Sequence, residues 1–128
     1  GTELTFAQGK IEACIAAADQ LLAIAQAGNM RELMAIALRW RGEALMADKR
    51  FDTARAALMQ ASEIAERIGR PRLSWDVLRS LARLGHRTGA ADDEHRHRAA
   101  AREIAARIER DLSGSELHFE SLEPLNMG

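Results

Sequence analysis

The densest group of potential metal ligands falls within residues 92–97, which include Asp92, Asp93, Glu94, His95 and His97. Carboxylates and imidazoles are common ligands of divalent metals. On a helix, however, residues two apart point roughly 200° apart, whereas a helical zinc pair needs a spacing of three or four. Asp93 and His97 have usable spacing but supply only two ligands. We therefore expect no metal site and no cofactor, and interpret the acidic run as a solvated helix N-terminus that complements the helix dipole.

Catalytic chemistry finds no sequence support either. No Gly-rich phosphate loop, GxSxG elbow or spaced pair of catalytic carboxylates occurs. Cys14, the only cysteine, lies near Ile15 and Ala18, where we expect a buried and unreactive thiol. Trp40 and Trp75 have no second aromatic residue in a basic setting, so we expect both to anchor the core between helices. We do not expect an enzyme.

Charge and composition exclude further classes of partner. The 18 basic and 19 acidic groups give a net charge of −1, so no global field attracts nucleic acid or an anionic membrane. A single cysteine excludes an intramolecular disulfide and favours a reducing, cytoplasmic setting. No apolar run approaches the ~18 residues of a membrane span, and the N-terminus lacks the pattern of a signal peptide. Gly1 in place of an initiator Met suggests an excised fragment.

The elements that must position these residues are helices arranged in a repeat. The segment 61–68 recurs at 101–108 with six of eight residues identical, an offset of 40. Alanine is abundant and prolines number two, which favours an all-α chain. Apolar spacing and turn signals predict a helical domain over residues 1–112, with helices at about 5–27, 30–47, 51–68, 71–88 and 91–112.

Apolar stripes indicate which helices are buried. The helix at 51–68 carries a single stripe, and the helix at 30–47 carries two, which implies contact on two sides. The helix at 91–112 is polar all round for two turns, so we expect only its second half to bury a face. Ser113, Gly114 and Ser115 are expected to interrupt the chain before a short helical turn within the tail 113–128.

Loops this short make successive helices antiparallel neighbours, and the natural outcome is an α-solenoid of helical hairpins. At least three repeats are generally needed for stability, whereas this chain offers about two, so a homodimer is one way to cover the exposed ends.

The chain resembles the tetratricopeptide repeat over about residues 30–110. That repeat pairs two helices in about 34 residues and prefers bulky residues around a Gly in its first helix, then Ala, a bulky residue and Ala in its second. The first unit matches with these residues: Leu38, Gly42, Leu45, Phe51, Ala54, Leu58 and Ala61. The second unit offers Leu78, Leu81, Ala82 and Gly85, then Glu94, Arg98 and Ala101, where Glu94 and Arg98 depart from the pattern. The small residues fall where helices are expected to approach closely.

The 40-residue spacing is similar to that of the extended tetratricopeptide repeats in large bacterial signalling and transcription regulators. The resemblance implies a right-handed solenoid whose first helices line a concave groove for extended peptides. Carried over to this sequence, the groove residues are Ile36, Arg39, Glu43 and Met46, then Asp76, Arg79, Arg83, His86 and Arg87. The Lys and Asn positions with which chaperone-binding members clamp a carboxylate differ here, so chaperone binding is not expected.

Arg79 and Arg83 are four residues apart on a helix, so their guanidinium groups could hold one carboxylate or phosphate together. The alternative is a solvated helix face with internal ion pairs to Asp76 and Glu94.

Three functions remain open on sequence grounds. The first is a protein-interaction module that binds a peptide, possibly acidic, or a neighbouring domain of a bacterial regulator. The second is a structural or homodimerising helical array with no ligand groove. The third is a receptor for a small anionic ligand.

Overall fold

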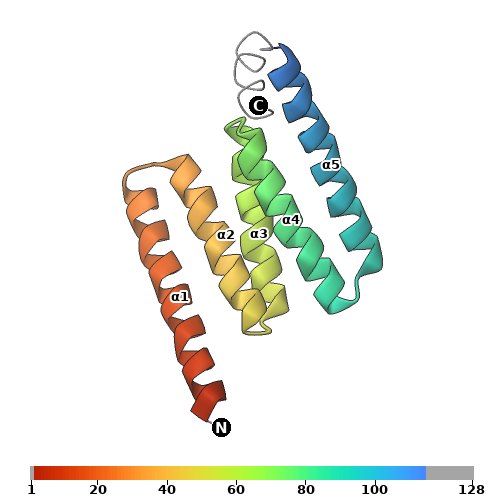
Figure 1. The fold of residues 1–128 in the computed structure, drawn as a ribbon. Helices are drawn as coiled ribbons and strands as arrows, with labels where there is room; N and C mark the ends of the chain where they lie inside the picture. Colours follow the sequence, from red (N-terminus) through yellow and green to blue (C-terminus); the bar gives the residue numbers. More distant parts are fainter. Residues whose placement is uncertain (1, 115–128) are drawn as a thin grey trace, which may run out of the picture.

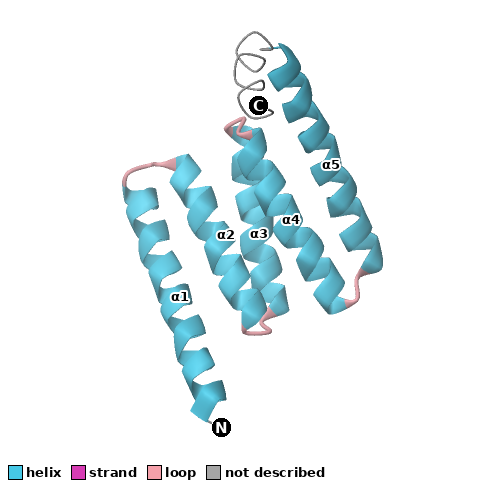
Figure 2. Ribbon diagram, viewed as in Figure 1, coloured by secondary structure: helices cyan, strands magenta, loops and turns pink. Residues whose placement is uncertain are grey.

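A computed structural model describes residues 2–114, with side chains described for residues 8–112. The described chain is all-α. Its five helices are α1 (Thr2–Ala27), α2 (Arg31–Ala47), α3 (Phe51–Arg67), α4 (Pro71–Thr88) and α5 (Ala91–Gly114). They run up and down in chain order as a row of antiparallel hairpins (Figures 1 and 2).

The predicted helix boundaries agree with the structure to within one residue for α2, α3 and α4. Helix α1 begins at Thr2, three residues before the predicted start. Helix α5 continues to Gly114, so the predicted break at Ser113 and Gly114 is wrong, because both residues belong to the helix. The predicted helical turn in the tail lies outside the described residues.

The same turn closes all four described hairpins. Helices α1 to α4 are each followed by one residue at positive φ, in order Asn29, Lys49, Gly69 and Gly89. The residue after it donates its backbone N–H five residues back, as in Met30 to Ala25 O at 2.8 Å and Ala90 to Gly85 O at 2.9 Å. This is the Schellman arrangement, which satisfies the last carbonyls of a helix and reverses the chain within three residues. The short turns therefore fix the antiparallel order.

Each helix packs against its neighbours in the sequence, and α2 also contacts α4. Within residues 2–114 no other pair of helices is in contact, so the row does not close into a bundle. Helix α3 lies behind α2 and α4 (Figure 1). The contact between α2 and α4 places both helices on one side of the molecule.

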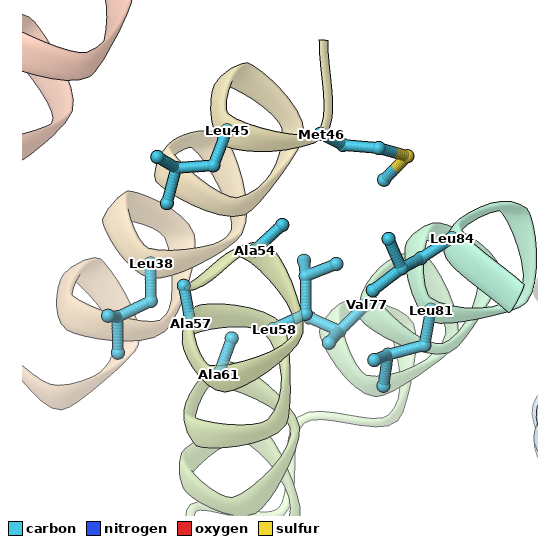
Figure 3. Close-up of a cluster of buried hydrophobic side chains, with 10 residues drawn as sticks. All are labelled: Leu38, Leu45, Met46, Ala54, Ala57, Leu58, Ala61, Val77, Leu81 and Leu84. Atoms are coloured by element: carbon cyan, nitrogen blue, oxygen red, sulfur yellow. The ribbon is translucent and has the colours of Figure 1, made fainter. Parts of the chain in front are cut away.

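The core lies where α2, α3 and α4 meet. Leu45, Leu58 and Leu84 are almost completely buried, and alanines fill the space between the helix backbones. Leu58 points from α3 toward both α2 and α4 (Figure 3). A Cβ placed on Gly42 would lie 2.6 Å from Leu58 Cγ, so only glycine fits there. The predicted close approach of helices at this glycine is confirmed.

The last hairpin, formed by α4 and α5, is also packed tightly. A Cβ on Gly85 would lie 2.8 Å from the backbone nitrogen of Glu94. Glu94 and His97 are half-buried. The prediction that the first two turns of this helix bury nothing is therefore wrong, because the glycine lets the start of α5 lie directly against α4.

Two predictions of burial are wrong. Cys14 is exposed, because α1 contacts only α2 among the described helices and buries a stripe that includes Ala18 and Ala25 but not the cysteine. Trp40 is 52% exposed. Its neighbours Ala37 and Ala44 are buried, so the packed stripe of α2 ends beside the indole.

Candidate functional site

Three side-chain bridges join α2 to α4. Arg83 donates to Glu43 with both terminal guanidinium nitrogens, of which Nη1 reaches Oε1 at 3.0 Å. Arg39 Nε donates to Ser80 Oγ at 3.2 Å. The third bridge runs from Arg87 Nη1 to the backbone carbonyl of Met46 at 3.1 Å. We call the surface that carries these bridges, together with Ile36 and Trp40 of α2 and Asp76 of α4, the α2–α4 face.

Four of the predicted groove residues, Arg39, Glu43, Arg83 and Arg87, thus bind the protein itself. The Asp76 carboxylate lies 3.9 Å from Arg72 on the same helix. His86 Nδ1 lies 3.4 Å from Glu94 Oε1 of α5. The alternative of ion pairs from Arg79 and Arg83 to Asp76 and Glu94 is not found among the described residues, because Arg83 reaches across to α2 and Arg79 stacks on Trp75.

Arg79 and Arg83 do not converge on one bound group in this structure. The Arg79 guanidinium lies 4.6 Å from the centre of the Trp75 ring, and Arg72 lies 5.1 Å from the same ring. Stacking of a cation on an indole contributes about 0.5–1 kcal/mol at exposed sites. Trp75 is half-buried, so it serves partly as a packing residue, as expected, and partly as a platform for two arginines.

Trp40 is a candidate binding residue that sequence reasoning missed. Ile36, Trp40 and Glu43 follow one another at helical spacing on one stripe of α2. Ile36 is half-buried and Glu43 bonds to α4, so the exposed indole lies on the α2–α4 face. The signal in the sequence is ambiguous, because Trp40 also shares an apolar stripe with Ala37 and Ala44.

Ser80 was also missed. It is fully buried at 0% exposure in a mainly apolar stripe of α4. Its hydroxyl donates to Asp76 O at 3.3 Å and accepts from Arg39 at 3.2 Å. A buried hydroxyl with its hydrogen bonds satisfied costs little, and this one fixes the direction of the Arg39 side chain. In the sequence, the only indication of this polar contact is that a serine lies one helical turn before Arg83.

A cleft of about 700 Å³ lies at one end of the α2–α4 face. We call it the end cleft. Its described lining comes from three helices and the turn before α4: Glu32, Ile36, Arg39, Arg70, Pro71, Arg72, Leu73, Asp76, Ile108, Asp111 and Leu112. Apolar side chains alternate there with charges of both signs. Leu112 is 48% exposed, so the cleft presents apolar surface to its contents.

A second cleft, of about 270 Å³, lies between α4 and α5. We call it the arginine cleft. Its lining consists of Trp75, Arg79, Ala82 and Arg83 from α4 and Arg98, Ala101, Arg102 and Ala105 from α5. Every charged residue in this described lining is an arginine.

Two titratable groups of α5 are shifted. The hydrogen bond from Arg98 lowers the pKa of Glu94, and His86 acts in the same direction against the opposing effect of burial. Burial lowers the pKa of His97, and the charge of Arg96 adds to this shift. Neither group faces a nucleophile or a second shifted group, so the arrangement is one of helix packing.

The acidic run at the start of α5 is occupied by ion pairs. Asp93 contacts Arg96 at 2.6 Å and Arg55 of α3 at 3.9 Å. Among the described residues, no group of three or more His, Cys, Asp or Glu side chains could hold a metal ion. No helix within residues 2–114 is long and apolar enough to cross a membrane.

A scan against family models and searches of curated proteins and of solved structures found no significant match to this chain. The resemblance to the tetratricopeptide repeat therefore depends only on the residues quoted above.

Proposed function

We propose that this chain is a tetratricopeptide-like protein-interaction module, an α-solenoid that binds a peptide or a neighbouring domain on its α2–α4 face. The observation that carries the proposal is an exposed tryptophan, Trp40, on the stripe of α2 that leads into the end cleft. In keeping with the sequence resemblance, the module would belong to a larger bacterial regulatory protein in the cytoplasm.

An exposed indole is suited to this role because tryptophan is enriched among the residues that dominate binding energy at protein interfaces. Trp40 leaves about half of its surface in water. Covering that surface with a partner would add to affinity by the same burial of apolar area that folds a core. Ile36, one helical turn away, lines the end cleft and would extend the apolar strip.

The bridges between α2 and α4 support the proposal in a second way. A face held by Arg83 and Glu43, and by Arg39 and Ser80, needs little rearrangement before it binds. Preorganisation of this kind lowers the entropic cost of association. These residues would then frame the site, while Trp40 and Ile36 supply most of the contact.

Selection of short linear peptides displayed on phage, with the full chain as target, tests this function. Peptides that bind the α2–α4 face should lose at least about tenfold in affinity for the Trp40→Ala variant, as expected for a central anchor. The matched control is Met59→Ala, which removes a side chain of similar exposure, 49%, from α3. Peptides that bind Trp40→Ala as tightly as the original chain would contradict the proposal.

A homodimerising array is the second candidate. Ile24, at 59% exposure, and Met30, at 42%, lie close together in sequence where α1 turns into α2. Sedimentation across a wide concentration range tests it. A dimer that persists on dilution and separates in an Ile24→Asp variant would favour this function over peptide binding.

A further inference from the structure

The arginine cleft corresponds to a groove that is already filled one hairpin earlier. There, Val77, Leu81 and Leu84 of α4 pack against the hairpin of α2 and α3 and join Leu58 in the core. The last hairpin, α4 and α5, presents its own groove beyond which the structure describes no further helix. A groove that receives a helix in one hairpin receives none of the described helices in the next.

The repeat offset of 40 shows what changed between the two grooves. Ala61 is 0% exposed and its equivalent Ala101 only 5%, so the small residue that lets helices approach is present in both. Leu58, fully buried, is replaced by Arg98, whose side chain is 53% exposed. The groove of the last hairpin has kept this alanine and has a cation in place of the central leucine.

The charge of the cleft is only partly compensated. Arg83 pairs with Glu43 and Arg98 pairs with Glu94, at 2.8 Å for the latter, and neither carboxylate belongs to the described lining. Arg79 stacks on Trp75. Among the described residues, neither Arg79 nor Arg102 has an ion-pair partner, so two guanidinium groups remain available to an anionic ligand.

We propose that the arginine cleft binds an acidic amphipathic helix of a partner protein. The shape favours a helix, because the floor formed by Ala82, Ala101 and Ala105 admits close helix packing and the equivalent groove holds α4. The charge requires carboxylates along that helix, since arginine forks bind carboxylates in pairs. This inference does not rest on peptide binding by the α2–α4 face. Arg83 borders both surfaces, but the residues proposed to make the contacts differ, Trp40 and Ile36 on that face and Arg79 and Arg102 in the cleft.

Titration with a synthetic amphipathic helix of Glu, Ala and Leu tests the inference, with Trp75 as the fluorescent reporter in a Trp40→Phe chain. Binding should shift the Trp75 emission and weaken with added salt. Arg102→Glu should weaken binding at least about tenfold. Arg31→Glu, an exposed change at the start of α2 outside the cleft lining, should leave it unchanged. Helical circular dichroism of each variant verifies the fold.

Three results would overturn the inference. Arg102→Glu could leave both affinity and salt dependence as they were, or the same peptide with Lys in place of Glu could bind equally well. Duplex DNA that binds as tightly as the Glu peptide would reveal a general polyanion surface instead.

The chain's own C-terminal segment is the remaining competitor for the cleft. Residues 115–128 carry Glu116, Glu120 and Glu123 and no Lys or Arg. A chain with all three changed to Lys should bind the Glu peptide within about threefold of the original. A gain of more than about tenfold would instead identify this segment as the occupant.

Discussion

Two equivalent grooves between paired helices differ in what covers them. The groove between α2 and α3 is filled by α4, which covers Leu58, whereas no helix within residues 2–114 covers Arg98 in the arginine cleft between α4 and α5. Ala61 of the first groove and Ala101 of the second are both buried, so a small residue is kept at that position. The difference lies in the larger side chains around that position, since Arg98 stands where the first groove has Leu58 and Arg102 where it has Ser62. Such changes decide whether a groove contributes to the core or to the surface.

This contrast separates residues that specify spacing from residues that specify a partner. Small residues such as Ala61 and Ala101 set how closely two helices lie, whatever covers them. The larger side chain at the repeat-equivalent position then selects an apolar or a charged occupant. A helical repeat can therefore keep its fold from one hairpin to the next while its surface chemistry changes.

The largest effect should come from a pair of equivalent truncations at the centres of the two grooves. Leu58→Ala should lower the free energy of unfolding by about 2–5 kcal/mol, because it leaves a cavity in the core. Arg98→Ala should change it by no more than about 0.5 kcal/mol, since this side chain is mostly exposed. Urea denaturation measures both. Equal losses would show that the arginine cleft is part of the core.

The sequence was sufficient to predict the helices because their signals are local. Apolar periodicity and the turns at Gly69 and Gly89 located the ends of α3 and α4 to within one residue. Lys49 shows that the turn does not require glycine, since it adopts positive φ in the same arrangement. Such signals depend on neighbours a few residues away, so a single sequence contains them.

The candidate site was harder to predict, because it depends on which helix lies opposite. The stripe of α2 containing Trp40 looks apolar in sequence, but α4 covers Glu43 and not the indole. Neither alternative considered for Arg83, a shared anion with Arg79 or ion pairs to Asp76 and Glu94, included the pair with α2 that the structure contains. Contacts between residues 40 apart follow from the crossing of α2 and α4, which no local pattern determines.

Glycine substitutions give the next largest effect and test whether the two hairpins are equally tight. Gly85→Ala should destabilise the chain by about 1–3 kcal/mol, because the new Cβ would lie 2.8 Å from the backbone of α5. Gly42→Ala should cost a similar amount against Leu58. Thermal unfolding monitored by circular dichroism provides the comparison.

The matched control for both is Gly9→Ala in α1, where a Cβ meets nothing within 4 Å. Alanine is favoured over glycine in a helix by up to about 1 kcal/mol, so this variant should be slightly more stable. If Gly85→Ala behaved like Gly9→Ala, the close contact between α4 and α5 would be refuted.

A smaller effect is expected for the bridge between Arg83 and Glu43, which joins the two hairpins across the α2–α4 face. A double-mutant cycle with Arg83→Ala and Glu43→Ala should give a coupling of about 0.2–1 kcal/mol, because exposed ion pairs are screened by water. The coupling should decrease with added salt. A coupling of zero at low salt would mean that the bridge does not hold the face together.

The smallest effect concerns His97, which occupies the repeat position of the buried Ala57. Burial lowers the pKa of His97, so the folded chain binds this proton less readily than the unfolded chain. Its contribution to stability is therefore present above the unfolded pKa of about 6.5 and is lost as the pH falls from there through the folded pKa. Urea midpoints should decline over this range and decline less in His97→Ala, with exposed His95→Ala as the control. Identical slopes in the two variants would assign the pH dependence to other groups and show that the half-buried His97 contributes nothing to it.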